Sequence, residues 1–172
     1  MKPIINIADV QLQARPAGFA PPESMNDQYG DVRMGIIGQR IGAQKLGYNV
    51  TAVPPGKRAF PFHNHRINEE MFFVLEGTGE VRVADATYPI RAGDVIACPP
   101  GGAKLAHQIV NTGTVELKYL AVSTRVTPEI AEYPDSGKFA VFAEFPGEAG
   151  ERPTFLRFVS REDASLEYWE GN

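Results

Sequence analysis

The 172-residue chain contains one cysteine, one tryptophan and three histidines. A single cysteine, Cys98, excludes an internal disulfide and fits a reducing compartment, so we expect a cytoplasmic protein. Because apolar residues and prolines flank Cys98, we interpret it as a small buried residue at a strand end and not as a nucleophile.

Long apolar runs and clusters of basic residues are also missing. No stretch approaches the roughly 20 apolar residues of a membrane span, and the N-terminus lacks the pattern of a signal peptide. The formal net charge is −4 and the pI is near 5.4, which disfavours a nucleic-acid partner. We expect no membrane and no nucleic acid as partners, and a small molecule as ligand.

Helical periodicity is absent from about residue 46 to residue 123, where short apolar segments alternate with turns rich in Gly, Pro and Asn. Short, evenly spaced strands are typical of a small barrel or sandwich, so the sequence predicts an all-β fold. The expected strands are residues 48–53, 70–75, 80–84, 94–98, 107–110 and 116–123.

The flanks are expected to be extensions of one domain. Residues 1–45 would wrap the barrel formed by residues 46–123, and residues 124–172 would pack on it. With 43% hydrophobic residues, a chain of this length has room for one core of ordinary size.

Within the C-terminal extension, Thr127, Pro128 and Glu129 have the order of an N-cap, a first helical position and a first-turn acid, so we expect a short helix ending before Pro134. Residues 139–145 and 155–159 are expected to be strands. Trp169 is expected to dock on the barrel or on a partner subunit.

All three histidines lie where they can meet. In a strand, residues two apart point to the same face, so His63 and His65 can present both rings to one point. Glu70 begins the next expected strand, and His107 begins a later one. Imidazole and carboxylate ligands together suit a divalent transition metal, namely Mn, Fe, Ni, Zn or Cu.

The surrounding residues resemble the two motifs of the cupin family. In the first, Gly56 precedes His63 and His65, four residues separate His65 from Glu70, and six separate Glu70 from Gly77. In the second, the family residues are matched as follows: Gly93, Pro99, Gly101, His107 and Asn111. The chain departs from the family pattern by one extra residue before His63, and by five residues instead of two between Gly101 and His107.

This resemblance covers residues 46–123 and implies a double-stranded β-helix, or jelly-roll barrel, of the RmlC type. It implies one metal held by His63, His65, Glu70 and His107. Glu69 competes with Glu70 for the carboxylate position, and the family spacing selects Glu70. It also supports a homodimer, which the apolar flanks favour independently.

Side chains around the metal are harder to assign. We predict that Phe72 and Ile109 form an apolar wall, that Lys104 in the inserted loop can reach an anionic substrate, and that Tyr119 points inward in one of its two possible registers. General grounds favour a solvated Lys104 over that contact. Three further phenylalanines, Phe60, Phe62 and Phe73, are expected in the core, and two cations, Lys57 and Arg58, in solvent.

Cupins include oxygenases, decarboxylases, isomerases and epimerases, so the family does not select a reaction. Our first hypothesis is a mononuclear metalloenzyme acting on a small oxygen-rich substrate such as a sugar derivative, keto acid or phenol, of isomerase or dioxygenase type. No catalytic acid or base is identified. The second hypothesis is a binding or sensor protein without turnover, and the third is a structural protein with a vestigial site.

Overall fold

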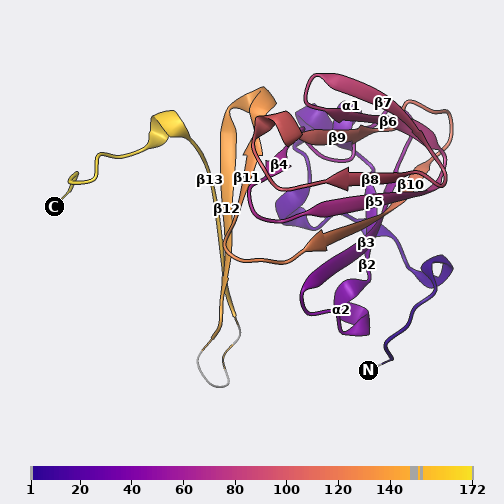
Figure 1. Ribbon diagram of the computed structural model, residues 1–172, viewed down its shortest axis with the longest axis horizontal. Coiled ribbons are helices and arrows are strands. Elements are labelled where there is room, and N and C mark those ends of the chain that lie inside the picture. The colour runs from indigo at the N-terminus through magenta and orange to yellow at the C-terminus, as the bar shows by residue number, and fades with distance from the viewer. Residues whose placement is uncertain (1, 148–150, 152, 172) are drawn as a thin grey trace.

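The computed structural model describes residues 2–147, 151 and 153–171. In these residues the chain is dominated by antiparallel strands, which confirms the all-β class (Figure 1). The strands are β1 (Gln13–Ala14), β2 (Arg33–Ile36), β3 (Leu46–Val53), β4 (Asn64–His65), β5 (Glu70–Glu76), β6 (Thr78–Val83), β7 (Ala86–Arg91), β8 (Val95–Cys98), β9 (His107–Val110), β10 (Leu117–Thr124), β11 (Glu129–Tyr133), β12 (Lys138–Phe145) and β13 (Thr154–Arg161).

The helices are short, and no helix among the described residues has the length and apolarity needed to cross a membrane. The two α-helices are α1 (Asn26–Tyr29) and α2 (Gly38–Ile41). The 3-10 helices are η1 (Ile7–Asp9), η2 (Ala17–Phe19), η3 (Glu23–Met25), η4 (Ala103–Leu105), η5 (Pro134–Ser136) and η6 (Glu162–Ala164).

Two sheets face each other across the core. One has the order β1-β2-β3-β10-β5-β8, and the other is β7-β6-β9. Isolated bridges join Val110 to Arg58 and His107 to His63, and β4 then pairs with β11, so the second layer continues into the sheet β13-β12-β11-β4. Residues from both flanks thus join the sheets: β1 and β2 extend the first layer, and β11 to β13 extend the second.

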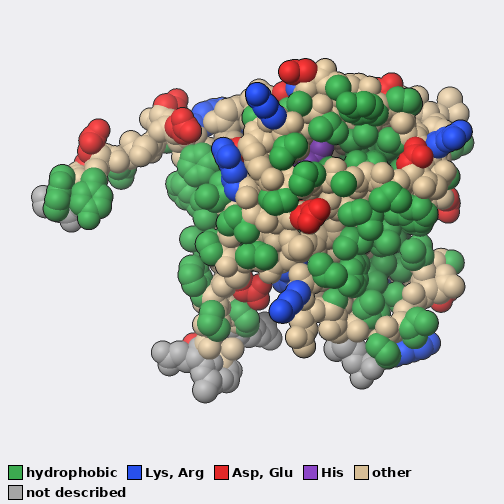
Figure 2. All heavy atoms as spheres, in the orientation of Figure 1, with side chains coloured by type: hydrophobic (Ala, Val, Ile, Leu, Met, Phe, Trp, Pro, Cys, Tyr) green, Lys and Arg blue, Asp and Glu red, His purple; other side chains and the backbone are tan. Residues whose placement is uncertain are grey.

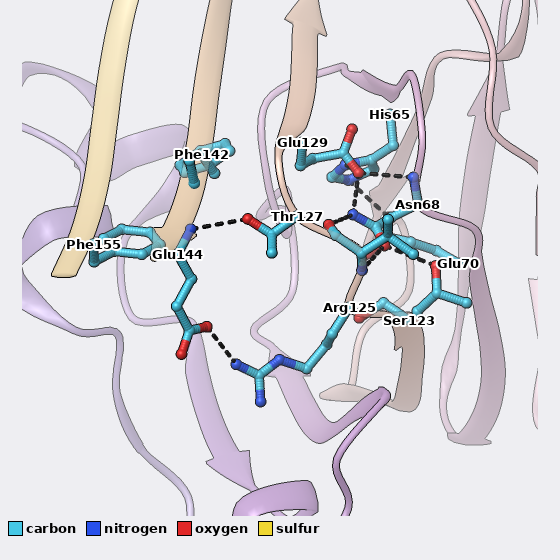
Figure 3. Close-up of a pocket in the computed structure, with 13 residues that line it drawn as sticks. His65, Asn68, Glu70, Ser123, Arg125, Thr127, Glu129, Phe142, Glu144 and Phe155 are labelled. Carbon is cyan, nitrogen blue, oxygen red and sulfur yellow. Dashed lines mark hydrogen bonds and ion pairs between the residues drawn. The ribbon is translucent and has the colours of Figure 1, made fainter. Parts of the chain in front are cut away.

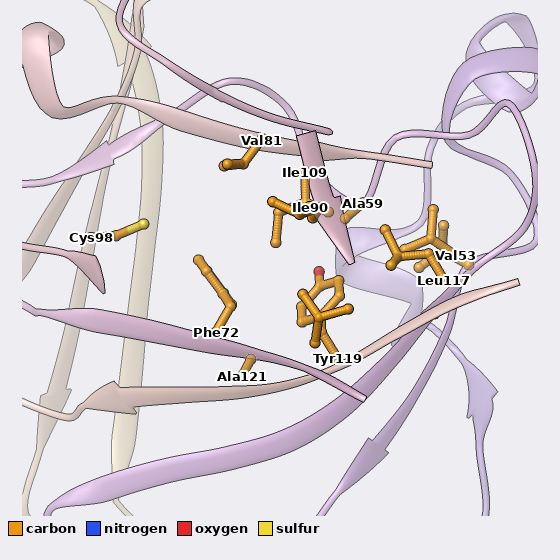
Figure 4. Close-up of a cluster of buried hydrophobic side chains, with 12 residues drawn as sticks. Val53, Ala59, Phe72, Val81, Ile90, Cys98, Ile109, Leu117, Tyr119 and Ala121 are labelled. Carbon is orange, nitrogen blue, oxygen red and sulfur yellow. The ribbon is translucent and has the colours of Figure 1, made fainter. Parts of the chain in front are cut away.

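The main core lies between these layers and is built from inward-facing side chains of both (Figure 4). Phe72, Val74 and Tyr119 come from the first layer, while Val81 and Ile109 come from the second. Each is at most 6% exposed. Tyr119 is 1% exposed, which settles its register as inward.

The turn between β5 and β6 shows why a glycine occupies position 77. Gly77 has φ +82°, and a Cβ atom there would lie 2.5 Å from the carbonyl oxygen of Glu116. Any other residue would be both strained and crowded. This tight turn sends the chain from the first layer to the second.

The expected helix after Thr127 is wrong. Residues Glu129–Tyr133 form strand β11, which pairs with β12 on one side and with β4 on the other. The local capping pattern is overruled because a strand here completes two ladders and buries Glu129 and Ala131.

Two smaller expectations also need correction, and one strand was missed. Lys57 is half-buried and its ammonium group donates to the carbonyls of Asn26 and Asp27, so it fastens α1 instead of being solvated. Trp169 is 76% exposed and contacts Tyr168 edge-on, so it does not dock on the barrel, and docking on a partner subunit stays a prediction. Strand β7 was not expected.

Candidate metal and ligand site

The three histidines and Glu70 come together at one end of the barrel. Glu70 opens β5, His65 ends β4, His107 opens β9, and the bridge to His107 fixes His63. Nε2 of His107, His65 and His63 lies 3.1, 3.3 and 3.9 Å, respectively, from the Oε2 atom of Glu70. Strand pairing therefore collects residues from distant parts of the sequence around one carboxylate oxygen.

Ligand atoms of His63, Glu70 and His107 lie within 4.8 Å of one another. Atoms that each lie about 2.1 Å from a shared cation are separated by roughly 3–4 Å, and Nε2 of His107 and of His63 lies 3.1 and 3.9 Å from Oε2 of Glu70. His65 is farther from His107, with ring centroids 6.5 Å apart, and approaches the group through Glu70. Glu69 is exposed and does not join the group.

Burial and neighbouring charges set the protonation states of these side chains. Burial, aided by the neighbouring His107, lowers the pKa of His63 to about 4, so its ring is neutral at neutral pH. Its Nδ1 atom lies 2.7 Å from the carbonyl oxygen of Pro61 and must carry the proton, which leaves the Nε2 lone pair facing Glu70. Neutral imidazole is the form that binds metals.

Glu70 is held as a carboxylate. Burial acts to raise its pKa, but hydrogen bonds from His107 and His65 outweigh burial and hold the pKa of Glu70 well below its usual range. Burial likewise opposes protonation of His65, yet Glu70 and Glu129 raise its pKa. The donor set of three imidazoles and one carboxylate fits a divalent transition metal.

A second carboxylate supports this group from behind. Glu129 is 6% exposed, and its oxygens accept from the backbone N–H groups of Arg66, Ile67, Asn68 and Ile130, and from the Asn68 amide. Its Oε2 atom lies 3.7 Å from Nδ1 of His65. Glu129 thereby fixes the turn between β4 and β5 and faces the back of one imidazole. The sequence pattern placed this residue in a helix and so missed its role.

A cavity of about 250 Å³ opens beside the group (Figure 3). His65 and Glu70 lie in its inner wall, Arg125 and Glu144 close another side, and Phe142 contributes an apolar surface. None of the four residues predicted for the substrate pocket lines this cavity. Arg125, Glu144 and Phe142 were not anticipated because they belong to the segment after residue 123, where no motif marked them.

The four predicted pocket residues lie elsewhere for identifiable reasons. Phe72 packs inside the barrel between His107 and Tyr119, with ring centroids 5.6 and 5.4 Å away. Ile109 and Tyr119 belong to the same core. Lys104 is exposed on η4, because the inserted loop turns its lysine outward.

Comparisons with known proteins agree with this geometry. The family model for the cupin domain matches residues 49–123. Protein SchB of Streptomyces halstedii is 32% identical over 108 residues, which are 63% of this chain and 75% of SchB.

The chain belongs to the cupin superfamily.

This cupin also resembles a solved structure along nearly its whole length. The structure described as a sugar phosphate isomerase of the cupin superfamily from Silicibacter pomeroyi has a TM-score of 0.74 and 23% identity, covering 96% of this chain and 98% of that one. At that identity the likeness shows the fold alone. Together with the paired antiparallel sheets, it confirms the expected jelly roll.

Another relative is named for the ligand that it binds. The oxalate-binding protein of Thermotoga maritima is 36% identical over 70 residues, which are 41% of this cupin. The matched residues span about half of that protein's length, 54%, and the same share of another curated relative.

Proposed function

We propose that this cupin binds one divalent transition metal through His63, His65, Glu70 and His107, and acts as a mononuclear metalloenzyme on a small oxygen-rich molecule. The substrate class is a sugar derivative, keto acid or phenol, and the reaction is of isomerase or dioxygenase type. The observation that carries the proposal is the convergence of three imidazole Nε2 atoms on one oxygen of Glu70, at 3.1 to 3.9 Å.

When bound, the metal would supply Lewis-acid polarisation of a substrate oxygen. The chain's own residues set the conditions for this chemistry. His63 is kept neutral by burial, Glu70 is kept anionic by its imidazole partners, and Phe72 packs against His107 and keeps water from the barrel side. Substrate would enter from the cavity beside His65 and Glu70.

A binding protein without turnover is the second candidate. The relative named for oxalate binding favours it, because a small dicarboxylate is the kind of ligand that a metal and a cavity of this size would hold. The vestigial-site hypothesis makes the opposite prediction, that the protein takes up no stoichiometric metal.

Reconstitution decides among these functions. The metal-free protein is incubated separately with Mn, Fe, Ni, Zn and Cu, and its metal content is measured by mass spectrometry. We expect one metal per chain in the wild type and a loss of it in His63→Ala and His107→Ala. Lys104→Ala, a matched change in the exposed inserted loop, should retain the metal.

Bound metal should also raise the melting temperature, because a ligand that binds only the native state adds about 3–4 kcal/mol at 100 to 1,000 times its Kd. Substoichiometric metal in the wild type, or full metal in both histidine variants, would refute the proposed site. The metal-loaded protein is then assayed with a panel of sugars, sugar phosphates, keto acids and phenols. If it consumes no oxygen and converts none of them, the enzyme function is excluded and the binding function remains.

A further inference from the structure

The cavity beside Glu70 contains a single positive side chain. Arg125 is the only Lys or Arg among the residues that line the cavity within the described parts of the chain. Three carboxylates, those of Glu70, Glu129 and Glu144, also line it. Of these, Glu70 and Glu129 are committed to the histidines and to backbone N–H groups.

Strand pairing sets the position of Arg125 relative to Glu70. Ser123 on β10 is the direct cross-strand partner of Glu70 on β5. Arg125 follows two residues later, about 7 Å along the chain, on the same side as Ser123. Its backbone N–H donates to the carbonyl of Lys45, which holds the main chain in place.

The guanidinium group of Arg125 has a weak partner. One of its Nη atoms lies 3.4 Å from Oε2 of Glu144, and the two side chains are 38% and 47% exposed. This is its only hydrogen bond to a described residue. A long, exposed ion pair of this kind contributes little and can exchange its carboxylate for another oxyanion.

Three other polar side chains of the cavity, those of Asn68, Thr124 and Thr127, already have hydrogen-bond partners, and Ser123 carries no charge. Thr124 accepts from the N–H of Glu69 and donates to Asn68, and Thr127 accepts from the N–H of Glu144. Figure 3 shows the bond from the N–H of Glu144 to Thr127, and the Arg125–Glu144 pair on the other side of the cavity from Glu70. Arg125 is therefore the group best able to recognise a ligand's charge.

We propose that Arg125 determines substrate specificity, and that the ligand is a small organic anion with a carboxylate or phosphate distal to its metal-facing oxygens. That distal group pairs with Arg125 and displaces Glu144, while the oxygen-rich end faces His65 and Glu70. This inference rests on the proposed metal-dependent function.

A series of 2-hydroxy acids tests the inference, because its members share one chelating end and differ at the other. Malate carries a distal carboxylate, 3-phosphoglycerate a distal phosphate, and 2-hydroxybutyrate a methyl group. Calorimetric titration into manganese-loaded wild type should show malate, 3-phosphoglycerate or both binding at least about tenfold more tightly than 2-hydroxybutyrate. The stronger of the two anions identifies the source of the charge.

Three variants test whether Arg125 causes the preference for a distal anion. Arg125→Gln should remove the tenfold preference while keeping manganese content and the affinity for 2-hydroxybutyrate. Glu144→Gln should strengthen binding of the distal anion several-fold, because it removes the competing carboxylate. Arg91→Gln, a matched change at an exposed site on β7, should behave as wild type.

The outcomes separate this inference from the proposed function. Loaded wild type that binds none of the three acids, or binds them equally, overturns the inference and leaves the metal site standing. A preference that survives in Arg125→Gln overturns it as well. Wild type that takes up no manganese or other tested metal overturns both.

Discussion

At the scale of single residues, the site depends on buried groups whose surroundings fix their charge. His63 is neutral because burial lowers its pKa to about 4, and Glu70 is anionic because three imidazoles surround it. The sequence was sufficient to predict that these side chains meet, since histidine is rare in the chain and the spacing is specific. It was not sufficient to identify Glu129, whose importance comes from a turn that folds back onto it.

Replacing Glu129 by Gln should destabilise the protein by about 2–4 kcal/mol. The amide loses charge-assisted hydrogen bonds and turns an N–H group toward backbone donors. Urea denaturation of the metal-free protein measures this loss. Glu162→Gln, an exposed change on η6, is the control and should leave the free energy of unfolding unchanged. Metal affinity should also fall by about 10- to 100-fold, because the Glu129 carboxylate lies 3.7 Å from Nδ1 of His65, behind the ring of a proposed ligand.

Cys98 offers a test by pH. It is 4% exposed, and burial, with a contribution from Glu70, raises the pKa of its thiol to about 12. Below pH 9 the folded protein should react with iodoacetamide about a thousandfold more slowly than the urea-unfolded chain, whose thiol titrates normally.

The raised pKa of the Cys98 thiol determines how the free energy of unfolding changes with pH. The folded state holds the thiol proton more tightly, so the contribution of Cys98 is complete below about pH 9 and is lost as the pH rises towards 12. Cys98→Ala should therefore flatten the alkaline fall in the free energy of unfolding. Rapid labelling of the native protein at neutral pH would contradict the buried position.

At the scale of elements, the alternating apolar pattern was a good guide to the strands and a poor guide to the segment after them. The predicted strand at residues 107–110 matches β9, and the strand predicted from residue 70 begins where β5 begins. Strand β7 was missed because Asp85 to Thr87 has turn composition and Pro89 follows; β7 tolerates that proline at the edge of its sheet. Strand β11 was missed because Thr127, Pro128 and Glu129 have the local pattern of a helix start, and because one of its two partners, β4, lies far away in the sequence.

Asn64 links three of these elements and should be sensitive to change. It is fully buried, and its amide donates to the carbonyl of Gly101 and to the carboxylate of Glu132. Asn64→Ala should cost about 1–3 kcal/mol, since it leaves the Gly101 carbonyl without its donor. It should also speed hydrogen exchange in the loop of residues 99–106. Unchanged exchange there would show that η4 holds the loop without Asn64.

At the scale of the whole molecule, apolar side chains remain uncovered. Hydrophobic atoms gather over the β12–β13 hairpin on the face shown in Figure 2. On β13, Phe155, Leu156, Phe158 and Val159 are 60%, 47%, 53% and 44% exposed. β13 is also the end strand of its sheet. An apolar edge strand is a ready surface for pairing with a second copy about a two-fold axis.

We therefore expect a homodimer that uses β13. Sedimentation velocity at micromolar concentration should give a dimer for the wild type and a monomer for Phe158→Glu, because a buried charge at the interface is costly. Val115→Glu places the same charge at an exposed valine outside the hairpin and should stay dimeric. A monomeric wild type would refute the expectation.

The residues proposed to hold the metal and the residues that shape the rest of the cavity lie on different strands, which bears on how such proteins diversify. The proposed metal ligands lie on β4, β5, β9 and the bridge before β4, whereas Phe142, Glu144 and Phe155 lie on the β12–β13 hairpin. Mutations in the hairpin can alter which molecule is accepted without disturbing the histidines. Under the proposed function, a lineage with this architecture acquires new ligands in small evolutionary steps while the residues proposed to hold the metal are inherited intact.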